Sequence, residues 1–451
     1  MTTTRVRFGQ WTVALLAAFA ILFTATASHA APSTASQHAL DGAAEYKLFL
    51  EDKFDVRLEA KLSKGNFIEA VADVLNIDAP KDKAVFADVS PSDDLYDAAA
   101  ALYGKGILQG PAIGGELPLT NAVAVSIAVR AADLKELAYT YPSAKVDKAL
   151  DQLGISAAGL GKHVAQELAA AVDTGFIPAE YRQGFSPKAT ADQAFANVLL
   201  GKVLETKGLY KNYIGYISDA DIIAKLNQAY ATSDIIQAPK LQKLVNTALE
   251  QELITGYNVK DSRFESNFVD ELALTYGHSD LKHAIQLIGL LRSEGLDAKV
   301  QFEPKTSAFV HLLEWGDPGP NVVKIANGNY IAYAKEYDLE FEFATKKDKE
   351  AFQAIILAYA KKNEADQTGL IAASWWQPLY YSATEIADYE VITNNLITDP
   401  EGPYTVHPFS LNENSEAVVK GLKAIDPDAV ITPYRFWVDV PFFNYLHGES
   451  T

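Results

Sequence analysis

Three segments of the chain share one order of parts, and this internal repeat constrains the fold more than any other feature of the sequence. Each segment has an alanine-rich helix pattern, a short tight stop, an apolar anchor and then a second helix pattern. The segments span residues 95–134, 164–204 and 241–276. One helical hairpin cannot cover its own apolar face, so we expect the three units to pack on one another.

Glycine and threonine mark where the helices of these units would end and begin. Gly110 and Gly256 follow apolar pairs, and glycine can take the left-handed conformation that closes a helix. Thr120 and Thr190 precede the second helices of the first two units. Gln193 lies three residues after Thr190, which is the spacing of a capping box. We therefore expect Thr190 to cap the helix that follows it.

This order of parts resembles the S-layer homology (SLH) repeats of bacterial surface proteins. The resemblance rests on the Gly-Ile-Leu-Gln-Gly stop at 106–110, the Phe-Ser-Pro anchor at 185–187 and the Phe-Ala-Asp-Val element at 86–89. It covers about residues 61–276. The family implies a pseudo-threefold helical bundle that holds an exported protein non-covalently to an anionic secondary cell-wall polymer or a peptidoglycan-associated glycan of a Gram-positive bacterium.

The family binds its polymer through a Thr-Arg-Ala-Glu-like motif at the start of the second helix. This chain has no arginine at the matching positions, 120–123, 190–193 and 269–272, and so lacks the bidentate contact that a guanidinium gives to a carboxylate. The second unit has the best supply of basic residues. The ligand-binding candidates are therefore Arg182, Lys188, Thr190, Gln193 and Thr120. The alternative is that the basic candidates are ordinary solvated side chains.

The first 30 residues have the pattern of a secretory signal peptide. Arg5 and Arg7 precede an apolar run over residues 11–23, and small residues at 28 and 30 fit cleavage after Ala30. The run is shorter than the roughly twenty residues that a membrane-spanning helix needs. We therefore expect a secreted, surface-associated protein without a transmembrane segment after signal removal. The alternative is an uncleaved anchor helix.

Composition excludes several kinds of chemistry. The chain has no cysteine, so it can form no disulfide, thiolate metal site or cysteine nucleophile. Its net charge of −19 argues against binding to nucleic acid. His278, Asp280 and His283 could ligate a metal, but no further ligand accompanies them, and histidines that lie at a helix start are the simpler interpretation. We expect no metal, no cofactor and no catalytic residue.

The last part of the chain has a different pattern. Residues 299–303 and 339–343 alternate like half-buried strands, whereas 348–361 and 413–423 have helical spacing. This mixture predicts an α+β domain. Trp375 and its neighbour Trp376 would point to opposite faces of a strand, so one ring could stack on a sugar. Aromatic residues in the core of the domain are the alternative.

The predicted fold class is thus a multi-domain chain, an all-α SLH-like helical repeat bundle followed by an α+β C-terminal domain. The expected parts are a signal peptide at 1–30, a lead-in segment at 31–60, the helical repeats at 61–276 and the α+β domain at 277–451.

The function predicted from these parts is that of an exported, non-catalytic cell-surface protein, attached to the wall through its repeats. One alternative is an exported enzyme or glycan-binding protein with its site in the C-terminal domain, and another is a purely structural helical solenoid. An enzyme would bring His278, His283 or His311 together with an acid such as Glu303.

Overall fold

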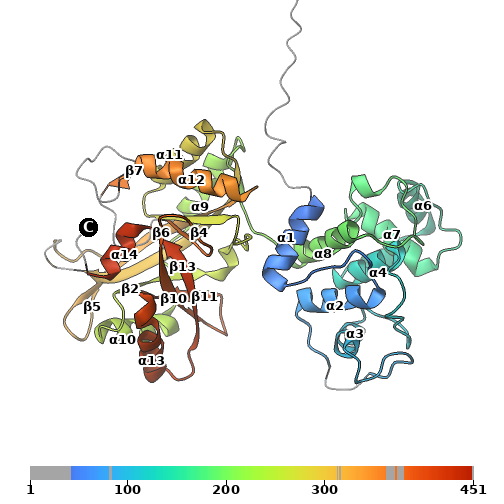
Figure 1. Cartoon of the computed structure of the whole chain (residues 1–451), viewed down its shortest axis with the longest axis horizontal. Helices are drawn as coiled ribbons and strands as arrows, with labels where there is room; N and C mark the ends of the chain where they lie inside the picture. Colours follow the sequence, from blue (N-terminus) through green and yellow to red (C-terminus); the bar gives the residue numbers. More distant parts are fainter. Residues whose placement is uncertain are drawn as a thin grey trace, which may run out of the picture. The chain divides into compact units, whose positions relative to one another are not determined.

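The computed structural model describes residues 42–80, 84–311, 313, 316–361, 371–372 and 380–448 (Figure 1). The expected signal peptide at residues 1–30 lies outside them. Two regions differ in secondary structure: a helical region, residues 42–207, and a barrel region, residues 215–448. No helix within the described residues is both long and apolar enough to cross a membrane.

Eight α-helices form the described part of the helical region. They are α1 (Gly42–Phe54), α2 (Lys64–Leu75), α3 (Leu95–Gly104), α4 (Asn121–Ala131), α5 (Lys135–Tyr139), α6 (Ser143–Asp151), α7 (Lys162–Asp173) and α8 (Gln193–Lys207), with a 3₁₀ turn, η2 (Ala179–Tyr181), before α8. Helix α1 lies in the segment expected to be a lead-in. It is a helix there because Ala43, Tyr46, Phe49 and Leu50 fall on one face, which is buried.

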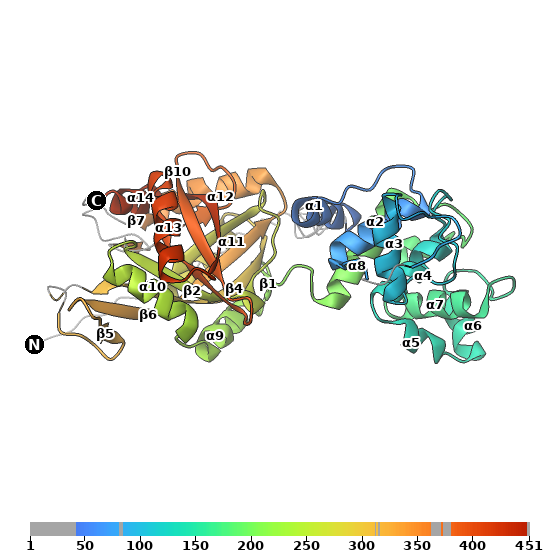
Figure 2. The same cartoon turned by 90° about the horizontal axis from the view of Figure 1, so that it is seen from below.

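The helices of this region pack in a cyclic order. Helices α2, α4 and α8 contact one another at the centre, and they lie side by side in Figure 2. Helix α3 packs on α2, α7 packs on α4 and α1 packs on α8. The chain therefore forms three pairs, α1–α2, α3–α4 and α7–α8, and the first helix of each pair packs on the central helix of another pair. All three pairs contribute to one continuous apolar core.

Short extended segments join the starts of the three central helices. Ser63 bridges Pro118, and Thr120 bridges Thr190. Thr120 caps α4, accepting a hydrogen bond from the Val123 amide at 3.4 Å. The prediction that Thr190 caps α8 is wrong. Its cap is Asp192, which accepts from the Phe195 amide at 2.8 Å, because the helix begins only after the bridged segment has ended.

Within the described residues, one sheet of the barrel region contains eleven strands. They are β1 (Gly215–Tyr216), β2 (Gly256–Asp261), β3 (Ala273–His278), β4 (Ala298–His311), β5 (Val322–Lys324), β6 (Tyr330–Phe343), β9 (Tyr380–Ser382), β10 (Glu390–Thr398), β11 (Tyr404–His407), β12 (Phe409–Ser410) and β13 (Val430–Val438). A separate parallel pair consists of β7 (Ala360–Lys361) and β8 (Ile371–Ala372). The helices are α9 (Ile222–Thr232), α10 (Pro239–Glu250), α11 (Leu281–Ser293), α12 (Lys346–Tyr359), α13 (Ser415–Ile425) and α14 (Val440–Leu446), with 3₁₀ turns η3 (Ser262–Phe264) and η5 (Asn412–Asn414).

Eight of these strands close into an antiparallel barrel in the order β4-β2-β11-β10-β13-β9-β3-β6, with β6 pairing back to β4. Strands β1, β5 and β12 extend the sheet at β4, β6 and β10. The pairing of β4 with β6 is the longest, running from Ala298 opposite Phe343 to His311 opposite Tyr330. These two long strands carry much of the lumen wall.

Alternation along the strands sends apolar side chains outward and polar ones inward. On β6, Leu339 and Phe341 pack in a core with helices α9, α11 and α12, whereas Asp338 and Glu340 lie on the other face of the strand. A second outer core joins the barrel to α10 and α13. Figure 1 shows α11 and α12 on one side of the strands and α10 and α13 on the other. Along β4 and β6 the barrel is thus apolar outside, under its helices, and polar inside.

The predicted fold class, an all-α repeat bundle followed by an α+β domain, is wrong. The described residues contain a closed eight-stranded antiparallel barrel with extra strands, together with fourteen α-helices. The third expected repeat, residues 241–276, belongs to the barrel region: α10 covers the barrel, and β2 and β3 are two of its strands. The expected boundary after residue 276 falls inside β3.

Gly256 explains why that third unit was misleading. It is not the left-handed end of a helix; it begins β2 and pairs with Phe309 of β4. A Cβ atom at this position would lie 2.9 Å from the carbonyl oxygen of Ala308, so the close approach of β4 requires glycine. Gly110 does have a left-handed φ, 84°, but it does not close a helix: α3 ends at Gly104, and the left-handed glycine next to that end is Gly106, with a φ of 72°.

Candidate ligand-binding site in the barrel

Three of the five predicted ligand-binding residues lie together in the helical region. Thr120 and Thr190 form a bridge, and Lys188 lies in the same segment as Thr190. The carbonyl groups on either side of Lys188, those of Pro187 and Ala189, accept hydrogen bonds from the first turn of α4 at 3.0 and 2.9 Å. The Lys188 side chain is exposed, so this set presents one basic group beside a helix N-terminus.

The other two predicted residues are engaged with the protein itself. Arg182 donates from Nε and Nη2 to the carbonyl groups of Ile177 and Val172, at 3.0 and 3.1 Å, and from Nη1 to Gln152 at 2.7 Å. Its guanidinium thus satisfies carbonyl groups at and beyond the end of α7. Gln193 donates to the carbonyl of Leu58. Neither side chain has its polar end directed to a site shared with Lys188.

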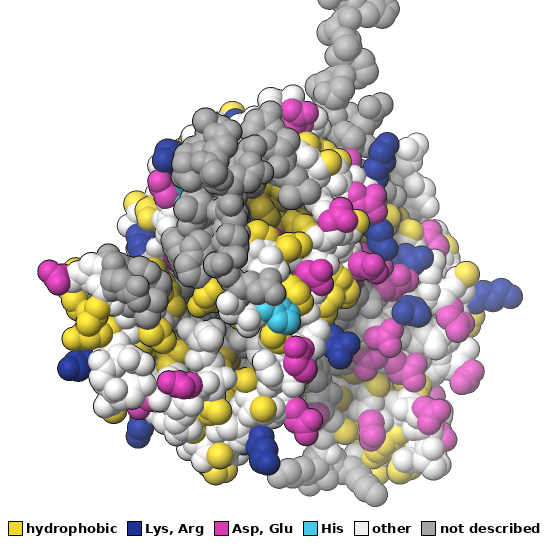
Figure 3. Space-filling view, turned by 60° about the vertical axis from the view of Figure 1, so that its left-hand side comes forward, with side chains coloured by type: hydrophobic (Ala, Val, Ile, Leu, Met, Phe, Trp, Pro, Cys, Tyr) yellow, Lys and Arg dark blue, Asp and Glu magenta, His cyan; other side chains and the backbone are white. Residues whose placement is uncertain are grey.

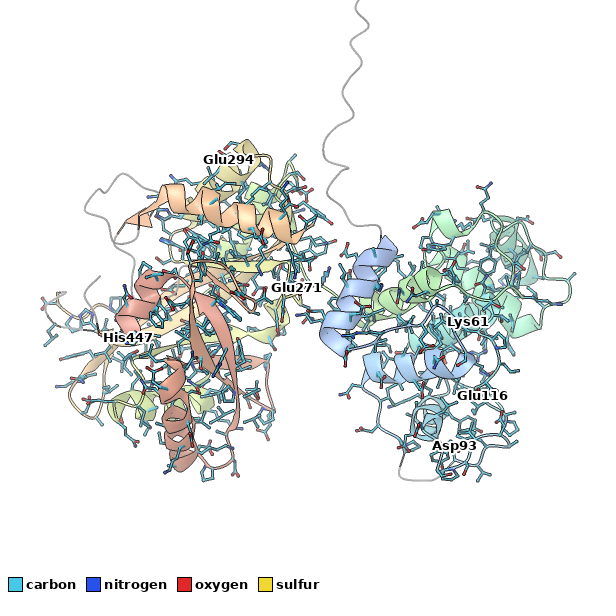
Figure 4. All side chains as sticks on the ribbon, viewed as in Figure 1. Lys61, Asp93, Glu116, Glu271, Glu294 and His447 are labelled. Carbon is cyan, nitrogen blue, oxygen red and sulfur yellow. The ribbon has the colours of Figure 1, made fainter. Side chains whose placement is uncertain are left out.

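A hollow of about 460 Å³ lies beside the start of α2, and its charge does not suit an anionic polymer. The carboxylates that line it are Glu69, Asp88, Asp93, Asp94 and Glu116, and no basic residue is among the described residues that line it. Figure 4 labels Asp93 and Glu116 in this part of the helical region. On the face that Figure 3 shows, Lys and Arg side chains lie among Asp and Glu side chains and form no separate basic patch.

The barrel lumen holds a cluster of buried charges. Lys260 on β2 places its Nζ 2.5 Å from Glu303 Oε2 and 2.7 Å from Asp338 Oδ2. Lys305 Nζ lies 2.7 Å from Asp338 Oδ1, and the Tyr381 hydroxyl donates to Asp338 Oδ2 at 2.7 Å. The strand register causes this meeting, because Glu303 pairs directly with Asp338, and Lys260 with Lys305. Two ammonium groups and one hydroxyl group therefore contact the Asp338 carboxylate.

Burial and ion pairing shift the pKa values of Glu303 and Asp338 in opposite directions. Burial raises the pKa of Glu303 to about 8, although Lys260 opposes the shift. Burial would also raise the pKa of Asp338, but the charges of Lys260 and Lys305 lower it well below its usual value. Burial disfavours the charge on Lys260 too, yet Asp338 and Glu303 keep its pKa well above normal. At pH 7 Glu303 is therefore mainly neutral, whereas Asp338 is ionised.

A cavity of about 550 Å³ extends from this cluster. Its volume falls in the range of small-molecule sites. One wall carries the carboxyl groups of Glu265, Glu303 and Glu340. The facing wall is aromatic: the ring of Phe436 lies 5.2 Å from that of Phe409, 5.7 Å from that of Tyr381 and 6.1 Å from that of Tyr434, measured between ring centroids.

Helix α14 lies at the other end of the barrel. Its residues Phe442, Tyr445 and Leu446 border a narrow hollow with Gly256 and Phe309, which are paired near the far ends of β2 and β4. The cavity described above is instead bordered by the segment from Ser262 to Asp270. A ligand would therefore enter the lumen from the side of that segment.

Asn394 contributes an unpartnered acceptor to the cavity wall. Its amide nitrogen lies 2.8 Å from the Tyr434 hydroxyl and 2.9 Å from His407 Nδ1. His407 is neutral, because burial lowers its pKa to about 3, and its Nε2 lies 2.9 Å from Thr405 Oγ1. The amide oxygen of Asn394 has no hydrogen-bond partner, although the residue is only 2% exposed. Such an atom costs about 1–3 kcal/mol unless a ligand or water donates to it.

The histidines that an enzyme would have brought to Glu303 lie elsewhere. His278 lies on the outer face of β3, with its ring 4.3 Å from that of His283 between centroids. His311 is the last residue of β4, and its ring contacts the Gly316 carbonyl. Across the described ranges, no group of three or more His, Cys, Asp or Glu side chains could hold a metal ion. Trp375 and Trp376 lie outside the described residues.

The sequence interpretation missed most of this site. It named Glu303 as an acid but did not connect it with Lys260, Asn394 or His407, which come from strands β2, β10 and β11. The available signal was the alternation of polar and apolar residues within each strand, which indicates a polar face but not that this face is enclosed. No known protein-family profile matches the chain, and no curated protein matches it.

Proposed function

We propose that the barrel region binds a carbohydrate unit in its lumen, within an exported cell-surface protein. The observation that carries this proposal is the unpartnered amide oxygen of Asn394 in the wall of a 550 Å³ cavity. A buried acceptor in a cavity large enough for a ligand indicates a ligand that donates hydrogen bonds. Sugar hydroxyl groups are such donors.

The two kinds of wall favour a sugar over other polar ligands. A pyranose ring has an apolar face of C–H groups and an edge of hydroxyl groups, which match the aromatic cluster around Phe436 and the acceptors on the facing wall. Tyr434 is 42% exposed, so its ring is available for stacking. These features favour the glycan-binding alternative, in a closed barrel in place of the expected α+β domain.

Saturation-transfer NMR of the mature chain with simple hexoses tests this site. We expect Asn394→Leu and Tyr434→Ala to abolish or strongly reduce the transfer to sugar protons, because they remove the acceptor and a stacking ring. Tyr103→Ala is the matched control, since Tyr103 is a similarly exposed tyrosine, at 44%, in the helical region. Unchanged transfer in both site variants would show that sugars do not bind in this cavity.

We also propose that the helical region attaches the exported protein to the cell wall, as the SLH resemblance implies. The cyclic packing of three helix pairs supports a bundle of that kind. Within it, Lys188 is the exposed basic candidate, beside the paired segments that carry Thr120 and Thr190. A lysine beside a helix N-terminus favours an anionic group there.

Retention on purified Gram-positive cell walls tests the attachment. Lys188→Glu should release the mature chain at lower salt than the unmodified protein, because it reverses the charge at the proposed contact. Lys148→Glu makes the same charge change at another exposed lysine of the helical region and should have no effect. Equal retention of both variants would contradict a contact at Lys188, and no retention of the unmodified protein would contradict the attachment.

A further inference from the structure

Two basic groups at the barrel cavity are already paired with carboxyl groups. Lys260 is bound by Glu303 and Asp338, and Lys53 of α1 lies 2.6 Å from Asp270 and 3.0 Å from Asp52. Arg435 of β13 also lines the cavity, and its exposed side chain forms no salt bridge within the described residues. The two lysines of the cavity wall are therefore already engaged, and Arg435 is exposed.

Two cavity carboxyl groups are not held in a salt bridge. Within the described residues Glu265 and Glu340 take part in no salt bridge, although both line the cavity. Desolvation raises the pKa of each, although the charge of Lys260, and for Glu265 also that of Lys53, opposes the shift. A cation placed beside either carboxyl group would favour its ionised form.

The remaining unsatisfied groups are acceptors as well. Besides Asn394 Oδ1, the amide oxygen of Gln301 is buried without a hydrogen-bond partner. Gln301 is the direct cross-strand neighbour of Glu340, and its amide nitrogen is fixed by the Phe264 carbonyl at 2.8 Å. The unsatisfied polar atoms in and next to the cavity wall thus accept hydrogen bonds, and Glu265 and Glu340 in the wall can carry negative charge. The complementary ligand is a donor with positive charge.

We infer that the sugar bound in the barrel is an amino sugar with a free, protonated amino group, which lies beside Glu265 and Glu340. This inference rests on the proposed carbohydrate site and names the class of sugar. An ammonium group supplies three donors and a charge, and two carboxylates that form no salt bridge within the described residues compensate its loss of water. A neutral hexose would leave both carboxyl groups without a salt bridge.

Titration calorimetry of the mature chain at pH 7 with D-glucosamine, D-glucose and N-acetyl-D-glucosamine tests the inference. These sugars differ only at carbon 2, as ammonium, hydroxyl and acetamide. We expect D-glucosamine to bind at least about tenfold more tightly than the other two, the gain of one charge-assisted hydrogen bond. Glu265→Gln and Glu340→Gln should reduce that preference to near unity, because an amide cannot carry the compensating charge.

Glu350→Gln is the matched control, since Glu350 is an exposed carboxyl group on α12 of the same region, and it should keep the preference. Equal binding of D-glucose and D-glucosamine would overturn the amino-sugar inference and leave the carbohydrate site standing. A preference that survives both cavity variants would overturn the placement of the ammonium group. Failure of all three sugars to bind would overturn the carbohydrate site as well.

Discussion

The buried carboxyl group of Glu303 makes the stability of the barrel depend on pH in a predictable direction. Its pKa is about 8 in the folded protein, against a usual value of 4.5, because burial outweighs the attraction of Lys260. A carboxyl group whose pKa is higher in the folded than in the unfolded state stabilises the fold fully at pH values below its unfolded pKa of 4.5. This stabilisation is lost as the pH rises towards the folded pKa of about 8. Glu303→Gln keeps the shape of the protonated form but cannot ionise. The variant should therefore gain stability relative to the unmodified protein as the pH rises.

The size of this effect follows from the two pKa values. Between them the folded protein holds a proton that the unfolded chain has released, so the free energy of unfolding falls by about 1.4 kcal/mol for each pH unit. From pH 5.5 to pH 7.5 the fall attributable to Glu303 is about 2.5 kcal/mol. The difference in unfolding free energy between Glu303→Gln and the unmodified protein should rise by that amount over the same interval.

Urea unfolding at several pH values, followed by tryptophan fluorescence, measures the difference. Trp437 lies on β13 of the barrel, and residues 31–214 contain no tryptophan, so the fluorescence does not report on the helical region directly. Glu390→Gln, an exposed carboxyl group on β10, is the matched control. A constant difference between Glu303→Gln and the unmodified protein across this interval would refute the reasoning, because it would mean that Glu303 ionises normally in the fold.

Two further predictions concern the helical region. Arg130 binds Glu167 through two contacts, at 2.6 and 3.0 Å, and Glu167 is fully buried. Arg130→Met should cost about 3–5 kcal/mol in urea unfolding followed by circular dichroism, since it leaves a buried carboxylate without its cation, and a loss below 1 kcal/mol would contradict that account. Asp192→Ala should cost about 1 kcal/mol because Asp192 caps α8, whereas Thr190→Ala should cost much less; equal costs would contradict this assignment of the cap.

Local patterns in the sequence predicted individual helices better than the way they combine. The segments 95–134 and 164–204 do contain helix pairs, α3–α4 and α7–α8. The third pair is α1–α2, and α1 begins in a segment rich in small polar residues that gave no strong helix pattern. Residues 241–276 took its place in the prediction because α10 has a strong apolar stripe and a glycine follows it. Helical spacing alone cannot tell a helix that packs on helices from one that covers a sheet.

No local pattern in the sequence predicted that the strands close into a barrel. The alternation at 299–303 and 339–343 was correctly interpreted as strands, and these residues lie in β4 and β6. The pairing of β2 with β11 joins residues more than a hundred positions apart. A strand with one face in water and a strand with one face in a polar lumen have the same period of two. The sequence therefore showed the polar faces but not that eight of them meet.

Charged side chains behave differently on a strand that faces water and on a strand that faces a closed lumen, and β6 is an example. Its inward face carries Glu336, Asp338, Glu340 and Glu342 at alternate positions. On a solvated sheet such a row would only repel weakly, because water screens it. In a closed lumen each carboxyl group needs a cation, a donor or a proton. Asp338 forms salt bridges with Lys260 and Lys305, whereas Glu340 forms none within the described residues and burial raises its pKa, although Lys260 opposes the shift. A carboxyl group that must either keep a proton or find a cation is the condition under which an ammonium ligand would bind, so the closure of the barrel and the chemistry of its proposed ligand follow from the same row of residues.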